Sequence, residues 1–171
     1  MAKKRVFYSF HFNNDFFRTM QVRNMGAIED DEPVSKNDWE KLKNTGDTAV
    51  ENWIEKHMKD KECLVLLIGT QTAGRKWINY EIAKAWSDGR GVLGIRIHGL
   101  EGTDGQQSVL GANPFSGFTV CQDPNKKQWD SIVPVKNPPF VTGKGVYGHI
   151  SENIEKWIED AIKIRKDFKC S

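Results

Sequence analysis

The sequence predicts an α/β domain in which helices cover both faces of a small, doubly wound parallel sheet. Three segments have the composition of strands, because they are β-rich or continuously apolar: Arg5–Phe12, Glu62–Gly69 and Val92–Gly99. Segments with apolar residues at helical spacing lie between and after these strands. Strands that alternate with helices favour βαβ units, in which the strands are parallel and helices pack on both faces.

The bulk composition indicates one globular domain over residues 1–171. The chain has 38% hydrophobic residues and a formal net charge of only +2, so charge alone does not indicate a nucleic-acid partner. The three cysteines and four histidines are scattered and form no CxxC pair, so we expect neither a disulfide framework nor a metal site. No secretory-type apolar core and no apolar run of about 18–20 residues is present, so we expect a cytoplasmic protein without membrane contact.

Local signals predict the elements of the first half. The first strand is followed by a helix, for which Asn14 or Asp15 is the expected N-cap. An acidic stretch with a Gly and a Pro predicts a loop over Gly26–Asp38. Helical spacing predicts two further helices, one that starts at Trp39 and one over Thr45–Asp60.

After the buried central strand, the expected order is a loop, a helix, a strand, a long loop, a segment with a short strand, and a final helix. Gly89 is the expected C-cap of the first of these helices, and Ser151 is the expected N-cap of the last. The long loop is of a length that is often functional in compact domains. The expected ranges are Thr70–Gly74, Arg75–Trp86, Val92–Gly99, Leu100–Gly117, Trp129–Val135 and His149–Lys166.

One glycine motif is rejected as a dinucleotide site. The segment GKGVYG (Gly143–Gly148) matches G-x-G-x-x-G, but no clear strand precedes it and only one helix follows. The dinucleotide fingerprint needs a preceding strand and an acidic residue about 20 residues later. We therefore expect a flexible turn that leads into the last helix. The first strand ends in SFHFNN, without the carboxylate pair of a receiver domain or the hydroxyl-rich phosphate loop of a flavodoxin.

The helix RKWINYEIAKAW carries a glutamate, Glu81, at the flank of its apolar face. Glu81 lies one turn after Trp77, so it could be half-buried beside the ring, where partial desolvation would raise its pKa. It could also be exposed, or paired with Lys84, Arg75 or Lys76. Because most helical glutamates are solvated, helix geometry alone favours this second alternative.

A longer segment that contains this helix resembles a known signature. Cys63–Ala85 combines a buried strand, a small polar loop, an Arg/Lys-Trp pair and a glutamate four residues after the tryptophan, as in TIR domains. Arg5–Asp15 likewise resembles the first TIR strand and its loop. The match is closer to the TIR-like ThsB-type proteins of the bacterial Thoeris anti-phage system. The matching pieces lie within residues 4–118, about two-thirds of the chain: SFH, WEKLKNTGD, LIGTQT, RKWINYEI, GIRIH and NPF.

The resemblance implies a flavodoxin-like fold and an activity on NAD, which is then the substrate and not a bound cofactor. Enzymatic TIR domains break the bond between nicotinamide and ribose, and ThsB-type members are implied to make a cyclic ADP-ribose isomer that activates a separate effector. On this analogy Glu81 is the catalytic carboxylate, and a phage-derived trigger is implied. The alternative class is a non-catalytic TIR-like module that works by self-association as a homo-oligomer.

Seven further residues are candidates for substrate binding, and all but His11 have a structural alternative. Phe10 could stack on a ring or pack in the core, and Arg75 could contact the pyrophosphate or be a solvated charge. Trp77 could line the ribose pocket or belong to the core, and Asn113 could contact the ligand or cap the turn at Pro114. The full set is Ser9, Phe10, His11, Trp39, Arg75, Trp77 and Asn113.

The acidic stretch IEDDEP (Ile28–Pro33) departs from the wider TIR pattern. In that pattern the loop at this place follows the second strand and helps the domains to assemble. No clear second strand is visible in this sequence, so the mode of assembly stays open.

Overall fold

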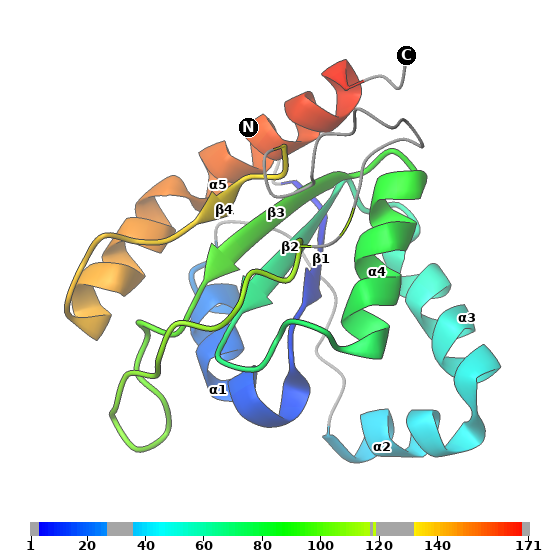
Figure 1. The fold of residues 1–171 in the computed structure, drawn as a ribbon, viewed down its shortest axis with the longest axis horizontal. Helices are drawn as coiled ribbons and strands as arrows, with labels where there is room; N and C mark the ends of the chain where they lie inside the picture. The colour runs from blue at the N-terminus through cyan, green and yellow to red at the C-terminus, as the bar shows by residue number, and fades with distance from the viewer. Residues whose placement is uncertain (1–3, 27–35, 117, 119–131, 169–171) are drawn as a thin grey trace.

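The computed structural model describes residues 4–26, 36–116, 118 and 132–168, and within these ranges the chain forms four strands and five helices (Figure 1). The strands are β1 Val6–Ser9, β2 Cys63–Ile68, β3 Gly91–Arg96 and β4 Val135–Lys136. The helices are α1 Phe12–Arg23, α2 Lys36–Thr45, α3 Asp47–Met58, α4 Lys76–Ser87 and α5 Gly143–Asp167. The order β2, α4, β3 is the strand–helix–strand unit that the sequence predicts, and α5 follows β4 at the end of the described chain.

The described strands form one parallel sheet in the order β1-β2-β3-β4. Ser9 pairs with Leu66, and Leu66 pairs with Gly94, so the carboxyl ends of β1, β2 and β3 lie at the same edge of the sheet. All six residues of β2 are buried, because this strand has a neighbour on each side and helices on each face. That burial explains its continuously apolar sequence.

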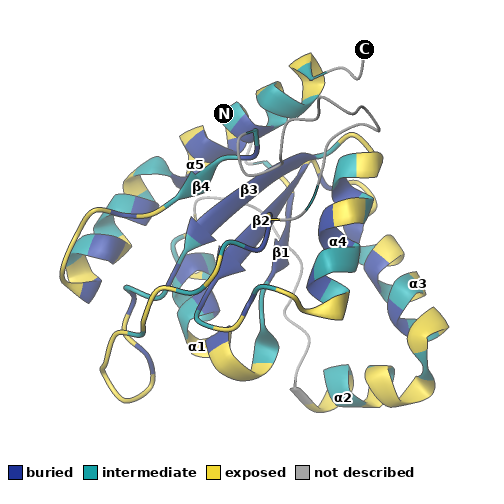
Figure 2. Cartoon of the chain, in the orientation of Figure 1, coloured by how far each residue is buried: buried dark blue, intermediate teal, exposed yellow. Residues whose placement is uncertain are grey.

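Helices cover both faces of the sheet, as Figure 2 shows by the buried strands between them. On one face, α1 and α5 pack against alternate strand residues such as Val65 and Ile95. On the other face, α3 and α4 pack against the intervening residues, such as Leu66 and Ile68. The predicted doubly wound α/β architecture is therefore confirmed, as is the flavodoxin-like class that the resemblance implies.

The prediction for the start of α1 was wrong. The N-cap is His11, whose carbonyl accepts hydrogen bonds from the backbone N–H groups of Asn14 and Asp15. Asp15 does not cap the helix, because its side chain turns inward and is only 1% exposed. Helix α2 also begins before the expected Trp39, and the acidic stretch Ile28–Pro33 lies outside the described residues.

The prediction for the start of α5 was also wrong. The segment Gly143–Gly148 is the beginning of the helix and not a flexible turn, and Ser151 lies well inside it. Thr142 is the N-cap, and its Oγ1 accepts a hydrogen bond from the N–H of Gly145 at 3.1 Å. The physical reason is tertiary, because Val146 and Ile150 are buried and extend the apolar stripe of the helix toward its start.

The remaining boundaries agree with the predictions to within a few residues. The C-cap of α4 is Asp88 and not the expected Gly89, which is the next residue and has φ of 85°, the left-handed conformation for which glycine is favoured there. β4 lies at the end of the segment expected to hold a short strand, of which residues 129–131 are not described. No helix in the described part of the chain is both long and apolar enough to cross a membrane.

Candidate active site

Glu81 lies in α4 close to the carboxyl end of β1. The helix begins at Lys76, and its inward face is made by Ile78, Ile82 and Ala85, which are buried. Glu81 shares this face and is only 7% exposed. The packing of α4 against the sheet therefore carries the carboxyl group inside the molecule.

The electrostatics of Glu81 are those of a buried carboxyl without a charged partner. Burial raises its pKa to about 8, and the nearby Ser9 hydroxyl acts in the opposite direction. Among the described residues, neither Glu81 Oε2 nor Ser9 Oγ has a hydrogen-bond partner of ordinary geometry, so the two groups lie close together without a well-formed hydrogen bond. Buried polar groups are normally hydrogen-bonded, so two unsatisfied ones side by side make this edge of the sheet the candidate functional site.

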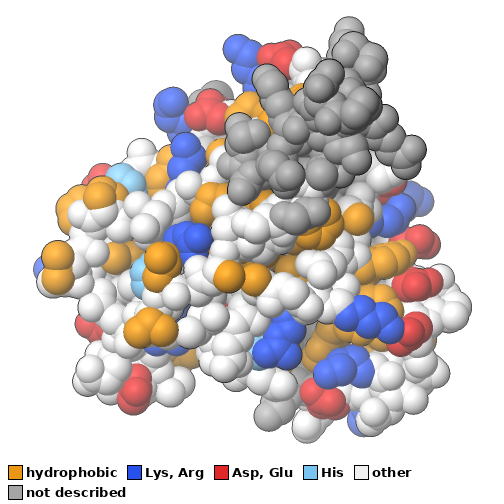
Figure 3. Space-filling view, viewed as in Figure 1, with side chains coloured by type: hydrophobic (Ala, Val, Ile, Leu, Met, Phe, Trp, Pro, Cys, Tyr) orange, Lys and Arg blue, Asp and Glu red, His pale blue; other side chains and the backbone are white. Residues whose placement is uncertain are grey.

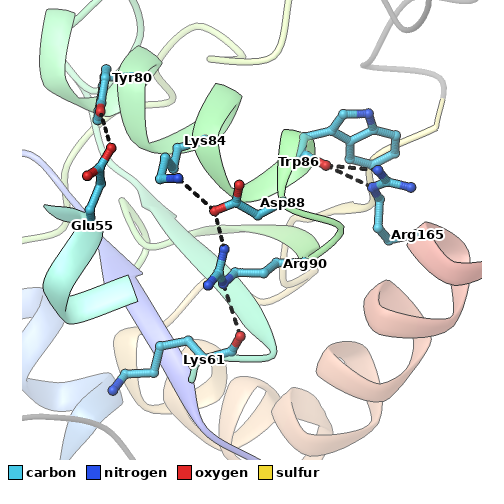
Figure 4. Close-up of polar contacts among 8 residues, drawn as sticks. All are labelled: Glu55, Lys61, Tyr80, Lys84, Trp86, Asp88, Arg90 and Arg165. Atoms are coloured by element: carbon cyan, nitrogen blue, oxygen red, sulfur yellow. Dashed lines mark hydrogen bonds and ion pairs between the residues drawn. The ribbon is translucent and has the colours of Figure 1, made fainter. Parts of the chain in front are cut away.

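The alternative that Glu81 is exposed or paired with a neighbouring cation was wrong. Lys84 pairs with Asp88 at 2.9 Å, at the far end of α4 (Figure 4). Lys76 pairs with Asp47, and Arg75 donates from Nε to the carbonyl of Gln71 at 3.1 Å. These cations have other partners because they project from the outer side of the helix.

The structure brings His11 and Arg75 near one another at this edge of the sheet, and Lys43 of α2 joins them. Burial lowers the pKa of His11, and the positive charges of Arg75 and Lys43 lower it further. In the space-filling view, basic and hydrophobic side chains lie side by side over the region where α4 approaches α2 (Figure 3). No pattern in the sequence pointed to Lys43, because it comes near His11 only through the tertiary fold.

Phe10 lies toward the opposite face of the sheet from Glu81. It packs against the core beneath α5 and stacks on Phe12, with ring centroids 5.7 Å apart. Phe16 of α1 completes this aromatic group, at 6.5 Å from Phe10. The packing alternative for Phe10 is therefore the one that the described contacts support.

The two candidate tryptophans, Trp39 and Trp77, pack against the core on the face of the sheet that α4 covers. Trp39 meets Trp53 edge-on at 5.8 Å, and Trp77 meets Tyr80 edge-on at 5.7 Å. Both remain partly exposed, so each has a core role and an open side.

Asn113 caps a turn. Its Oδ1 accepts a hydrogen bond from the N–H of Phe115 at 2.9 Å, and the buried Phe115 anchors this turn in the core. In the described part of the chain, no group of three His, Cys, Asp or Glu side chains could hold a metal ion.

The sequence was also compared with known proteins. The family model described as Thoeris protein ThsB, TIR-like domain, matches residues 7–102. A protein of Bacillus cereus (strain MSX-D12), named "Putative cyclic ADP-D-ribose synthase ThsB1", is 33% identical over 127 residues. The match covers 70% of this chain and 66% of that protein, so the chain spans slightly less than two thirds of its relative's length. The matched family model covers more than half of the chain, which therefore belongs to the TIR-like ThsB family of Thoeris proteins.

Proposed function

We propose that this protein cleaves the nicotinamide–ribose bond of NAD and forms a cyclic ADP-ribose-type product. The observation that carries the proposal is the buried carboxyl of Glu81, without a charged partner and beside the Ser9 hydroxyl at the carboxyl edge of the sheet. The name of the Bacillus cereus relative supports the class of product. The same proposal includes a phage-derived trigger, a cytoplasmic location and a separate effector that binds the product.

The reaction breaks the bond between the ribose C1′ and the nicotinamide nitrogen. The electron pair leaves with nicotinamide, which becomes neutral, and positive charge develops on the ribose as in other glycoside cleavages. A carboxylate beside the ribose stabilises that charge and orients the ribose hydroxyls. A nucleophile within the same molecule then forms the new bond to C1′, and Glu81 can accept the proton that this nucleophile loses.

The raised pKa of Glu81 suits this sequence of steps. The free protein holds the group largely protonated at neutral pH, since its pKa is about 8. A positively charged nicotinamide close to it favours the ionised form. Substrate binding is thus expected to release the proton and to produce the carboxylate where the ribose cation develops.

Two cations suit the other end of the substrate. Arg75 and Lys43 lie near His11 at the sheet edge, and their charges, with burial, lower the pKa of His11, so it offers a neutral imidazole while the two cations face the pyrophosphate of NAD. We place the pyrophosphate beside this group. The substrate contacts that we propose are Ser9, His11, Trp39, Arg75 and Trp77, whereas Phe10 packs in the core on the other face and Asn113 caps the turn before Phe115.

The test compares nicotinamide release from NAD by the wild type and Glu81→Gln. The variant should lose at least about a hundredfold in rate, because an amide cannot carry the negative charge. Glu55→Gln is the matched control, since Glu55 is an exposed carboxylate next to α4. Its Oε1 accepts a hydrogen bond from the hydroxyl of Tyr80, which lies on α4, at 3.4 Å. The same three proteins are assayed in extracts of phage-challenged cells, with the cyclic product followed by mass spectrometry.

Equal release by the wild type and Glu81→Gln would contradict the catalytic assignment. The alternative function, a non-catalytic module that self-associates, predicts no turnover under either condition. That alternative also expects Glu81 to be exposed or paired, and its burial without a charged partner supports the enzyme instead.

A further inference from the structure

Asp15 is a second buried carboxyl group at the same edge of the sheet, and the proposed reaction does not use it. It lies in the first turn of α1 and is only 1% exposed. Its side chain reaches the end of β2, where a Cβ built on Gly69 would fall on both carboxylate oxygens. Gly69 thus leaves the space that the carboxylate of Asp15 fills.

Thr72 links Asp15 to the backbone of the loop that follows β2. Thr72 Oγ1 accepts a hydrogen bond from the N–H of Gly69 at 2.8 Å, and its hydroxyl donates to Asp15 Oδ2 over a longer 3.4 Å. Because the backbone N–H uses Thr72 as an acceptor, the single hydroxyl proton is left for the carboxylate. Asn14 Nδ2 donates to the other oxygen, Oδ1, at 3.0 Å. Each oxygen of Asp15 therefore has a donor from the protein itself.

The same loop, residues 69–74, is held from its other side by the long loop after β3. Thr70 Oγ1 and Ser108 Oγ are 2.6 Å apart, and a Cβ on Gly111 would meet the carbonyl oxygen of Thr70 at 2.8 Å. Loop 69–74 ends at Arg75, the N-cap of α4. The contacts that hold this loop therefore also determine where α4 begins.

We propose that Asp15 is a positioning residue: through Thr72 and Gly69, its carboxylate fastens loop 69–74 to α1 and so holds Glu81 beside Ser9. The two sides of the site come from separate parts of the chain, β1 with α1 and β2 with α4. Asp15 joins them where both leave the sheet. A role of Asp15 in catalysis rests on the proposed function of Glu81. The contacts of Asp15 with Thr72 and Gly69, which we call the Asp15–Thr72–Gly69 clamp, do not depend on that proposal.

The clamp should depend on pH. Burial raises the pKa of Asp15 to about 6, opposed by the hydrogen bonds from Asn14 and Thr72 and by the positive charge of Arg18. Arg18, on α1 itself, is the charged side chain that acts on Asp15 among the described residues. Carboxylates accept stronger hydrogen bonds than protonated carboxyls do, so the clamp should loosen as the pH falls through about 6.

Nuclear magnetic resonance on Thr72→Val tests the proposal without any need for NAD turnover. The two readouts are hydrogen exchange at the Gly69 amide and the titration midpoint of the Glu81 carboxyl. The variant should speed Gly69 exchange about tenfold or more relative to the amides within β2, because the acceptor is lost. It should also lower the Glu81 midpoint by about one pH unit, since a loosened loop admits water. Thr72→Ser, which keeps the hydroxyl, should restore both values.

Thr19→Val is the matched control, because it makes the same substitution at another fully buried threonine. Thr19 lies on α1, and its Oγ1 has no partner among the described residues. This variant should leave both readouts as in the wild type. An unchanged Glu81 midpoint in Thr72→Val, or an equal change in Thr19→Val, overturns the proposal. If Thr72→Val does not fold, Asp15→Asn supplies the same comparison with the same two readouts.

Catalysis gives a separate readout where NAD turnover is measurable. Thr72→Val should lower kcat about tenfold and change KM less, as expected for a misplaced catalytic group. A wild type without turnover would count against the proposed function and would leave the decision on Asp15 to the Glu81 midpoint.

Discussion

Two carboxyl groups are buried among the described residues, and their surroundings explain why their pKa values differ. Burial raises the pKa of Asp15 to about 6 and that of Glu81 to about 8. Asp15 accepts hydrogen bonds from Asn14 and Thr72, which favour its ionised form, whereas only the Ser9 hydroxyl acts in this way on Glu81. Asp15 therefore has its hydrogen-bond partners within the protein, whereas Glu81 Oε2 has none among the described residues, as the proposed catalytic role requires.

Glu81→Gln should change how stability depends on pH. The folded-state pKa of about 8 lies above the ordinary value of 4.5, so the protonated group favours the folded state. This stabilisation is fully present below about pH 4.5 and is lost as the pH rises through about 8. Glutamine cannot ionise, so the variant keeps its stability as the pH rises. Relative to the wild type, its free energy of unfolding should therefore increase by a few kcal/mol between about pH 4.5 and about pH 8.

Urea unfolding at the two ends of this range measures the effect. A difference between the two proteins that stays constant with pH would show that Glu81 is not a buried titrating group. Glu55→Gln removes an exposed carboxylate by the same chemical change. Its free energy of unfolding should differ from that of the wild type by less than about 0.5 kcal/mol at either pH.

At the scale of elements, the starts of α1 and α5 show where local signals mislead. Asp15 has the right chemistry for an N-cap, but its side chain points inward and fills the space that the missing side chain of Gly69 leaves. The glycines of Gly143–Gly148 lower helix propensity, yet the buried contacts of Val146 outweigh them. In both helices the boundary is decided by a tertiary contact, which a reading of neighbouring residues cannot include.

The start of α5 can be tested by comparing two possible caps. Thr142→Ala should lower the free energy of unfolding by about 1 kcal/mol, because it removes the acceptor for the N–H of Gly145. Ser151→Ala lies inside the helix and should be neutral or slightly stabilising. Chemical denaturation of the two variants measures both values, and the reverse order would show that the helix begins near Ser151.

The junction between α1 and the end of β2 can be tested by a double-mutant cycle. Gly69→Ala should cost about 2 kcal/mol or more, because the added methyl group falls on the carboxylate of Asp15. In an Asp15→Ala background the same change should cost much less, which gives a coupling energy of about 1–3 kcal/mol. Gly74→Ala is the control: no atom lies within 4 Å of its added Cβ, so its cost comes from φ of 80° and should be equal in both backgrounds. A cycle without coupling would contradict the contact.

For the whole molecule, the architecture could be predicted because its main signals are local. The apolar run of β2 and the helical spacing of α4 each identify one element, and their alternation indicates a parallel sheet. Because α4 directly follows β2, this order also places Glu81 near the carboxyl edge of a parallel sheet. The burial of Glu81 does not follow from this order, because burial depends on how closely α4 packs beside Ser9. The roles of Lys43 and Asp15 were missed for the same reason, since Lys43 comes near His11, and Asp15 near Thr72, only through contacts between distant segments.

The contact between α5 and the sheet gives a prediction for the stability of the whole domain. Gly91 begins β3, and a Cβ at this position would lie 2.8 Å from the backbone nitrogen of Ile162 in α5. Because backbone cannot yield as a flexible side chain does, Gly91→Ala should push α5 away from the sheet and cost about 1–3 kcal/mol. Gly148→Ala makes the same change within α5, where nothing lies within 4 Å of the added Cβ, and should stabilise the domain by about 0.5–1 kcal/mol. Thermal unfolding should therefore show shifts of opposite sign, and a Gly91→Ala variant as stable as the wild type would show that α5 does not lie this close to β3.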